Sequence, residues 1–236
     1  MKNFCNFLEI KKASERSKMR KFIPEHLYVQ IPIKENDDPL IDFSCFCQKE
    51  KLDVHISLVW DNKKSAPCRM RLSVAKRLKK AWIELKKKND LLTFKISDAY
   101  RPIRLQKILF RQIWSETSKR YPKADRKEIY LKVTQFVADP KNNPPHSTGG
   151  AVDLTLFDIF SGKELDMGTK IDSLSQKSYT FCTKITASQK RNRKLLFKLM
   201  QKQDFVNAPT EWWHYSYGDQ YWAAHKNKKH AIFFSK

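Results

Sequence analysis

The sequence PPHSTGGAVDLTLFD, residues 144–158, places His146 seven positions before Asp153. Two adjacent glycines lie between them, in a chain that has only five glycines. Imidazole nitrogens and carboxylate oxygens are both zinc ligands, so one interpretation is a metal site around which Gly149 and Gly150 let the backbone turn tightly. The other interpretation is a Pro- and Gly-containing loop that enters a buried strand, with polar side chains that only satisfy local hydrogen bonds. This stretch alone does not decide between them.

A second histidine and a glutamate lie further along the chain, in the sequence EWWHY at residues 211–215. A zinc hydrolase keeps three protein ligands, leaves one coordination position open for water and holds a carboxylate nearby as general base. His146, Asp153 and His214 would complete such a ligand set for one Zn²⁺ per chain, and Glu211 would be the base. Residues three apart on a regular strand face opposite sides. We therefore expect Glu211 in an irregular segment before a strand and His214 within that strand.

An arginine in the sequence SDAYRP, residues 97–102, is a further candidate. Arg101 follows a predicted strand and precedes Pro102, which ends the extended segment and opens a helix. Its immediate neighbours favour a structural role, a salt bridge to Asp98. The alternative role is catalytic, because a fixed guanidinium can polarise a carbonyl and stabilise the oxyanion of a tetrahedral intermediate.

The elements that must position these residues follow from the hydrophobic periodicity. Apolar residues at every third or fourth position predict helices, and alternating or continuous apolar runs predict strands. We expect helices over residues 68–88, 103–120 and 125–138, and one that begins at the cap residue Ser188. We expect strands over residues 26–33, 52–60, 91–98, 151–157, 211–218, 220–225 and 231–235. Because helices come early and no βαβ alternation follows, we predict an α+β fold with a mixed or antiparallel sheet.

Two of the predicted helices carry clear orientation signals. In the helix over residues 103–120 we expect four apolar side chains to face the core: Leu105, Ile108, Leu109 and Ile113. In the helix over residues 125–138, Asp125 and Glu128 form a D-x-x-E start that is typical of a helix N-terminus.

The length and composition indicate one domain over residues 1–236, with an irregular N-terminal region over about residues 1–66. Hydrophobic residues make up 41% of the 236 residues, which is enough for a core. No window holds the roughly 18 apolar residues of a membrane span, and the N-terminal apolar run is too short for a secretory signal. We expect a soluble, cytoplasmic protein. The five cysteines include no C-x-x-C pair, so we expect no disulfide framework and interpret Cys45 and Cys47 as small buried side chains.

The net charge of +22 could steer the protein toward polyanions. The excess is diffuse, however, and recurs in residues 76–88, 190–202 and 225–230. In the first two stretches apolar residues recur at helical spacing, so the lysines there are typical of the solvated faces of amphipathic helices. Aromatic residues are not interleaved with the basic ones as a single-strand stacking platform requires. We expect no specific nucleic-acid partner, and keep a basic nucleic-acid binder as the remote alternative.

Four motifs occur in an order that resembles one known family: SDAYRP, HSTGGAVDLTL, LDMGT and EWWHY. They resemble the D-alanyl-D-alanine dipeptidase family of zinc peptidases, which includes the dipeptidase of vancomycin resistance. That family belongs with the D-Ala-D-Ala carboxypeptidases and hedgehog-like zinc domains, and the resemblance covers about residues 90–220. It implies a hedgehog/DD-peptidase-like fold and a set of roles. The zinc ligands would be His146, Asp153 and His214, the catalytic base and acid would be Glu211, and the transition-state stabiliser would be Arg101.

The resemblance is less complete for the residues that recognise substrate. Within LDMGT it implies that Asp166 binds the free ammonium group of the substrate, and the alternative is a role in a turn or cap. The family often has serine two residues before the first histidine, where this chain has Pro144. A different donor for the substrate carboxylate, such as Ser147 or a backbone N–H, must then serve. After DMGT the family commonly reads Pro-Phe-Asp, whereas this chain reads Lys-Ile-Asp and ends the motif at Asp172.

These observations predict a zinc dipeptidase that hydrolyses D-Ala-D-Ala or a closely related dipeptide. One alternative is a carboxypeptidase or endopeptidase of the same superfamily that acts on the peptides of cell-wall peptidoglycan, since a cationic surface suits anionic wall polymers. Another is a noncatalytic zinc-binding module. The presence of both Glu211 and Arg101 counts against that module, because a purely structural zinc site needs neither.

Overall fold

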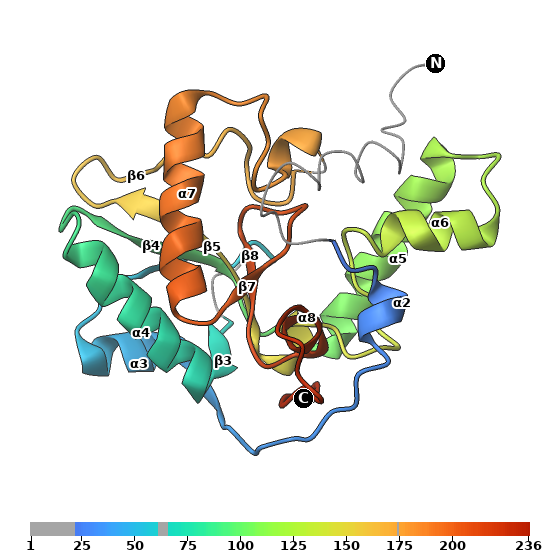
Figure 1. Ribbon diagram of the computed structural model, residues 1–236, viewed down its shortest axis with the longest axis horizontal. Coiled ribbons are helices and arrows are strands. Elements are labelled where there is room, and N and C mark those ends of the chain that lie inside the picture. The colour runs from blue at the N-terminus through green and yellow to red at the C-terminus, as the bar shows by residue number, and fades with distance from the viewer. Residues whose placement is uncertain (1–21, 61–65, 174) are drawn as a thin grey trace.

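A mixed sheet of six strands lies at the centre of the protein, whose computed structural model describes residues 22–60, 66–173 and 175–236 (Figure 1). Its strands follow the order β2 (His55–Ile56), β4 (Leu92–Asp98), β5 (Ala151–Asp158), β8 (His214–Ser216) and β7 (Val206–Asn207). A sixth strand, β6 (Lys163–Glu164), pairs with the end of β5. Only the β2–β4 pair of this sheet is parallel. The predicted α+β class with a mixed sheet is confirmed.

The register of the three central strands places candidate functional residues next to one another. Asp153 on β5 lies opposite Asp98 on β4 and, on its other side, opposite His214 on β8. The β4–β5 pairing is irregular between Ile96 and Asp98, and irregularities of this kind re-aim side chains near active sites. The first six residues of β5 are all buried. The site is therefore built on buried strands at the centre of the sheet.

Helices cover the sheet from two sides. On one side, α4 (Leu72–Lys86) and α7 (Ala187–Lys202) pack on each other and on strands β4 and β5, respectively (Figure 1). On the other side, α5 (Ile103–Arg120) packs on α6 (Arg126–Val133). The short helix α2 (Glu25–Tyr28) packs on α8 (Gln220–His225). One continuous hydrophobic core joins the sheet with α4, α7, α2 and α8, whereas α5 and α6 contribute no residue to it.

The remaining elements are short and close the fold around the central sheet. Strands β1 (Leu40–Asp42) and β3 (Arg69–Arg71) form a separate antiparallel pair, and α3 (Phe43–Glu50) follows β1 directly. Two 3₁₀ turns, η1 (His146–Thr148) and η2 (Gln176–Ser178), lie in the loops on either side of β5 and β6.

Sequence patterns located most of the long elements correctly. Helix α5 has the predicted bounds, and β4 and β5 agree with prediction to within one residue at each end. Helix α4 begins four residues later than predicted because Arg69–Arg71 pairs with β1 instead. Helix α6 ends at Val133, five residues early, although Asp125 caps it as expected by accepting a hydrogen bond from the Glu128 N–H. Helix α7 is capped by Thr186 through a capping box, so the predicted cap at Ser188 is wrong.

Three predicted strands are wrong. Residues 26–33 contain α2 and a turn, because Leu27 is exposed and the Gln220 amide donates to the carbonyls of both Val29 and Ile31 in place of a partner strand. Residues 220–225 form helix α8, since Asp219 caps that segment. Residues 231–235 contain only a single bridge, between Ala231 and Ile33. Residues 52–60 do include a strand, but it is only the two residues of β2.

The inward orientation predicted for helix α5 is also wrong. Gln106 is the one fully buried residue of this helix, and Ile108 is 54% exposed. Leu105, Ile108, Leu109 and Ile113 line a cavity instead of the core. The helical spacing identified an apolar face correctly, but spacing does not show whether that face meets a core or a ligand-sized space.

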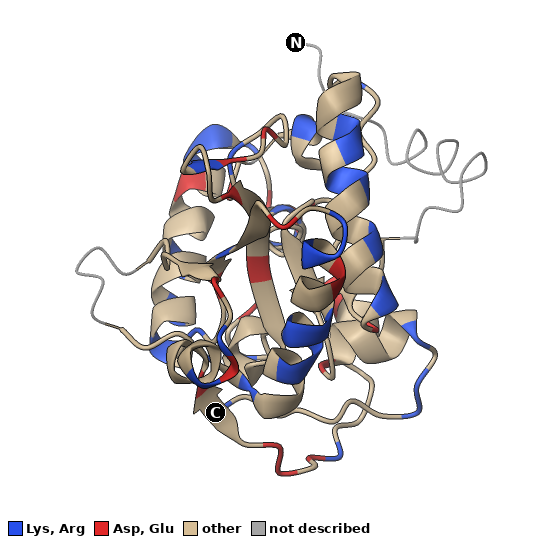
Figure 2. Ribbon diagram, turned by 90° about the vertical axis from the view of Figure 1, so that its left-hand side faces the viewer, with Lys and Arg blue, Asp and Glu red and all other residues tan. Residues whose placement is uncertain are grey.

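Basic residues recur over the helices and loops without forming a single stripe, as Figure 2 shows for one side of the molecule. No described helix is both long and apolar enough to cross a membrane. In α3, Cys47 is buried as expected but Cys45 is exposed.

The C-terminal segment after α8 is tied to the loop that precedes β5. The backbone N–H of Lys236 donates to the carbonyl of Ser147 at 3.0 Å. The buried Arg71 joins the two segments, because its Nε donates to the carbonyl of Thr148 at 2.7 Å and its Nη2 donates to the carbonyl of Phe234 at 2.8 Å. The loop that carries His146 is therefore held by residues near the end of the chain.

Candidate metal centre

The two glycines between His146 and Asp153 are each required by the local backbone. Gly149 ends η1 with φ of +73°, a left-handed conformation that glycine adopts without a steric penalty. Gly150 has no such φ, but a Cβ there would lie 2.3 Å from the carbonyl oxygen of Tyr217. The pair thus turns the chain sharply from η1 into β5 and lets β5 lie close to the backbone after β8.

The structure brings three predicted ligands together. The Nε2 atom of His146 lies 3.1 Å from Nδ1 of His214, and that Nδ1 lies 2.9 Å from Oδ1 of Asp153. The third side of the triangle formed by these groups runs from His146 Nε2 to the other oxygen of Asp153, Oδ2, and is 3.4 Å. Ligands held at zinc–ligand distances of 2.0–2.2 Å around a tetrahedral ion lie about 3.3–3.6 Å apart. The three groups therefore nearly match the spacing that a zinc ion requires.

Hydrogen bonds outside the triangle orient both imidazole rings. His146 Nδ1 lies 2.8 Å from the carbonyl oxygen of Ala99, which can only accept a hydrogen bond, so the proton of a neutral ring is on Nδ1 and Nε2 is free. His214 Nε2 lies 3.2 Å from the hydroxyl oxygen of Ser216, which leaves Nδ1 directed at the triangle. Partners of this kind fix the tautomer and orientation of metal-binding histidines.

The histidines and the aspartate of the triangle stabilise one another's charged forms. Burial lowers the pKa of His146, but the carboxylates of Asp153 and Asp98 outweigh burial and raise that pKa to about 9. Burial raises the pKa of Asp153, but His146 and His214 lower it well below its usual range. Without an ion, a proton on His146 neutralises the buried Asp153 carboxylate, so an ion that binds here must replace that proton.

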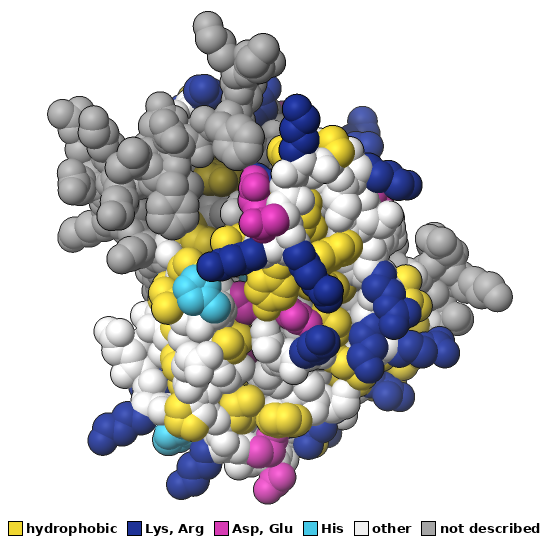
Figure 3. Space-filling model, turned by 90° about the vertical axis from the view of Figure 1, so that its right-hand side faces the viewer, with side chains coloured by type: hydrophobic (Ala, Val, Ile, Leu, Met, Phe, Trp, Pro, Cys, Tyr) yellow, Lys and Arg dark blue, Asp and Glu magenta, His cyan; other side chains and the backbone are white. Residues whose placement is uncertain are grey.

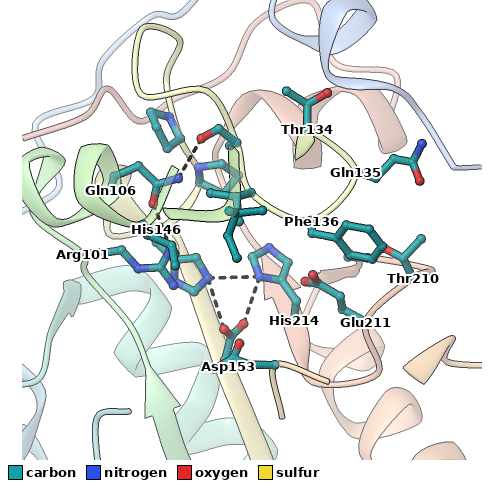
Figure 4. Close-up of a pocket in the computed structure, with 18 of the residues that line it drawn as sticks. Arg101, Gln106, Thr134, Gln135, Phe136, His146, Asp153, Thr210, Glu211 and His214 are labelled. Atoms are coloured by element: carbon teal, nitrogen blue, oxygen red, sulfur yellow. Dashed lines mark hydrogen bonds and ion pairs between the residues drawn. The ribbon is translucent and has the colours of Figure 1, made fainter. Parts of the chain in front are cut away.

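Glu211 lies where the sequence places it, in an irregular segment directly before β8, with His214 as the first residue of the strand. The side-chain amide of Asn207 donates to the carbonyls of both Glu211 and His214, at 2.9 and 3.0 Å, and so fixes this turn. In Figure 4 the Glu211 carboxyl group lies beside the His214 ring. Burial, and then the charges of Asp153 and Asp172, raise the pKa of Glu211 well above its usual value.

Arg101 forms the salt bridge to Asp98 that its neighbours predict. Its Nε donates to Asp98 Oδ2 at 3.0 Å, and its Nη1 donates to Oε1 of Gln106 at 2.9 Å. Burial lowers the pKa of Arg101, but Asp98 and then Asp153 raise it overall. The other oxygen of Asp98 accepts from Nε1 of Trp60 at 2.8 Å. The guanidinium is thus held rigidly, and it also lines the same cavity as the three ligands.

One cavity of about 690 Å³ is lined by all five candidate residues: Arg101, His146, Asp153, Glu211 and His214. On the face shown in Figure 3, acidic side chains lie among hydrophobic ones, with basic side chains around them. Asp172 also lines the cavity. Burial, and then the charges of Asp153 and Asp98, raise the pKa of Asp172 to about 6.

Asp166 is not among the residues that line the cavity. Its Oδ1 accepts the backbone N–H of Gly168 at 2.8 Å, and its Oδ2 accepts the side-chain amide of Gln189 at 2.8 Å. These bonds place it in a turn against the start of α7, which is the alternative role considered for it. Sequence reasoning missed Asp172, although one signal pointed to it: the aspartate is the only residue of the Pro-Phe-Asp pattern that this chain retains.

The fold and the site together define a hydrolytic type of metal centre, with ligand atoms in a cavity wall and a free carboxyl group beside them. The chain belongs to the D-ala-D-ala dipeptidase family, Peptidase_M15, whose pattern matches residues 60–235. This membership confirms the resemblance seen in the four motifs.

Two proteins of this family show the extent of the match. Over 226 residues the chain is 33% identical to the D-alanyl-D-alanine dipeptidase of Synechocystis sp. (strain ATCC 27184 / PCC 6803 / Kazusa), with 86% of this chain and 91% of that protein covered. It is 33% identical over 100 residues to the D-alanyl-D-alanine dipeptidase of Enterococcus faecium, with 42% and 47% covered. Among solved structures, the LdcB LD-carboxypeptidase aligns with a TM-score of 0.42 and 20% identity, over 83% of this chain and 74% of that one.

Proposed function

We propose that this protein is a zinc-dependent dipeptidase, acting as one domain, that hydrolyses D-alanyl-D-alanine or a closely related dipeptide. The observation that supports this most directly is the convergence of three ligand atoms and one free carboxyl group in a single cavity. Family membership and the names of the related dipeptidases support the choice of substrate.

Zinc is the metal that best fits the three ligand groups. Two neutral imidazoles and one carboxylate, from His146, His214 and Asp153, form a ligand set that suits Zn²⁺, and they leave one position for water. The hydrogen bonds to Ala99 and Ser216 direct the two ring nitrogens at one point. When bound, zinc would supply a water activated at neutral pH and would polarise the scissile carbonyl.

Glu211 is the proposed general base and acid. A carboxyl group with a raised pKa takes a proton from water readily and can hold that proton until the leaving amine needs it. Arg101 is the proposed stabiliser of the oxyanion that develops on the scissile carbonyl. Because Asp98 and Gln106 hold its guanidinium in place before substrate binds, little reorganisation is needed as the charge forms.

Asp172 is the proposed ligand of the substrate's free ammonium group, in place of Asp166. It is an exposed carboxyl that lines the cavity, and it could form a charge-assisted hydrogen bond to an ammonium group of the substrate. Asp166 already accepts two hydrogen bonds outside the cavity. The Ser147 hydroxyl donates to the carbonyl of Arg101 at 2.9 Å, so this donor is not free to bind the substrate carboxylate.

The proposal is tested by metal analysis and a peptidase assay on one purified sample. We expect about one zinc per chain, loss of that zinc in His214→Ala, and hydrolysis of D-Ala-D-Ala but not L-Ala-L-Ala. N-acetyl-D-Ala-D-Ala and a D-Ala-D-Ala-terminated pentapeptide should be cleaved more slowly, because a dipeptidase recognises both free ends. Well-folded wild-type protein without zinc would contradict the metal assignment. Equal or faster cleavage of the blocked or longer peptide would instead favour a carboxypeptidase.

A further inference from the structure

The cavity extends well beyond the groups that a small dipeptide needs. Its volume of about 690 Å³ falls among cavities that hold drug-sized ligands, whereas a dipeptide with two methyl side chains is much smaller. The additional walls are apolar and come chiefly from α5 and the loop after α6. They include Leu105, Leu109, Ile113, Phe136 and Val137. Such walls favour methylene or other apolar groups of a ligand.

One carboxyl group in this wall has an oxygen without a partner. Glu25, on α2, is only 4% exposed and lines the cavity. Its Oε1 accepts the backbone N–H of Asp139 and the side-chain amide of Asn142, both at 3.0 Å. Its Oε2 is buried and has no hydrogen-bond partner within the described part of the chain. Burying a carboxylate oxygen costs free energy unless the oxygen accepts a hydrogen bond. Oε2 is therefore suited to accept a hydrogen bond from a donor group on a bound ligand.

Glu25 belongs to a different part of the cavity from the metal centre. Asp153 lies on β5 and His214 on β8, with Glu211 directly before β8. Glu25 lies on α2, and its carboxyl group accepts hydrogen bonds from Asp139 and Asn142, in the loop after α6. Its carboxyl group is therefore held by different elements from the cluster that would hold the reacting peptide bond.

The charges of the cavity favour a cation at Glu25. Of the described residues that line the cavity, Arg101 is the only arginine or lysine, and it is already paired with Asp98. Titratable groups near Glu25 in the described part of the chain include Asp139, Tyr28 and Tyr130, none of which carries a positive charge. A ligand with an ammonium group would meet no repulsion from these residues.

We propose that the apolar walls and Glu25 form a subsite for a long alkylammonium side chain, so that the enzyme accepts dipeptides that contain lysine or ornithine. This inference rests on the proposed dipeptidase function. The methylenes of such a side chain would lie along Leu105, Leu109 and Phe136. Its terminal ammonium would donate a charge-assisted hydrogen bond to Oε2 of Glu25.

The test compares lysine with norleucine, which has the same carbon chain but no charge. Wild-type protein is assayed with D-Lys-D-Ala, D-Ala-D-Lys, their norleucine counterparts and D-Ala-D-Ala. We expect the lysine peptide to exceed its norleucine counterpart in kcat/KM by at least about tenfold in one of the two positions, the size expected of a hydrogen bond to a charged group. Glu25→Gln should bring this ratio close to one. Glutamine can still accept both hydrogen bonds at Oε1, so the variant changes mainly the unpartnered oxygen.

Glu116→Gln is the matched control, because it removes the same charge from the exposed side of α5, outside the cavity. It should keep the wild-type ratio. The ratio should also rise with pH through about 7, because burial raises the pKa of Glu25 to about 7 while the lysine side chain stays charged. A purely structural role for Glu25 would not produce this dependence.

Binding gives a second readout that does not require turnover. Calorimetry with the Glu211→Ala variant should show tighter binding of the lysine peptide than of the norleucine peptide, and the added Glu25→Gln change should remove the difference. Equal kcat/KM and equal affinity for the two peptides, or a ratio unchanged in Glu25→Gln, would overturn the subsite. If wild-type protein cleaves no peptide, including D-Ala-D-Ala, the proposed function fails, and calorimetry still decides whether the subsite exists.

Discussion

Replacing Gly150 with alanine would place a methyl group 2.3 Å from the carbonyl oxygen of Tyr217. Ordinary contacts of this kind begin near 3.4 Å, so the backbones of β5 and the segment after β8 would have to separate by about 1 Å. Overpacking of a buried site costs about 1–3 kcal/mol, and the reduced entropy of the unfolded chain returns about 0.4–1 kcal/mol. We expect a net loss of roughly 1–2 kcal/mol in the free energy of unfolding. Because Asp153 is three residues away, we also expect weaker zinc binding.

Gly162→Ala is the matched control for this prediction. Unlike Gly150, Gly162 has a positive φ, +67°, but a Cβ there would meet nothing within 4 Å, so only the conformational cost is incurred. Urea unfolding of both variants gives the stability change, and competition with a chelator gives the zinc affinity. Our reasoning is refuted if Gly150→Ala keeps wild-type zinc affinity and is no less stable than Gly162→Ala.

Further predictions concern single side chains of the cavity. Glu211→Ala should retain zinc but lose nearly all turnover, and near-normal rates would exclude the proposed proton transfer. Arg101→Ala should lower kcat more than it raises KM, because the charge that it meets develops in the transition state; a change in KM alone would contradict this. Asp172→Asn should weaken cleavage of free D-Ala-D-Ala by about tenfold or more, whereas Asp166→Asn should not; the reverse order would restore the role first assigned to Asp166. Glu25→Gln should be stabilised relative to wild type above about pH 7. A carboxyl group whose pKa is raised from 4.5 to about 7 in the folded state lowers the free energy of unfolding as pH rises through that range, here by roughly 3 kcal/mol at most. A difference in melting temperature between variant and wild type that is the same at both ends of the range would contradict this prediction.

The three proposed metal ligands, which the structure brings together, could be predicted from sequence because their signals were local and chemically specific. His146 and Asp153 lie in one loop–strand segment, and the glycines between them indicated a tight turn that the structure confirms. His214 required a second motif, and the β5–β8 register that joins the two is not visible in the spacing of either motif. The residue proposed to bind the substrate's ammonium group could not be decided from sequence. Asp166 and Asp172 lie six residues apart, and only the fold shows which of them faces the cavity.

The errors in the predicted secondary structure have a common physical cause. A pattern of apolar residues does not specify which other element will pack against them. Residues 220–225 have strand-like composition, yet a cap at Asp219 and packing against α2 make them a helix. Residues 26–33 lack an available strand edge, and the side chain of Gln220 satisfies two of their carbonyls. Long elements such as α5 and β5 were predicted well because their periodicity extends over many residues.

The bond between Lys236 and Ser147 has a consequence for how the protein is made. Chains emerge from the ribosome N-terminus first, so the loop with His146 is synthesised long before residues 233–236. Until those residues appear, the carbonyl of Ser147 lacks its bond from Lys236, and Nη2 of Arg71 lacks its bond to the carbonyl of Phe234. His214 is also synthesised after His146 and Asp153. A chain synthesised only as far as residue 213 therefore lacks one of the three proposed ligands and should not retain zinc.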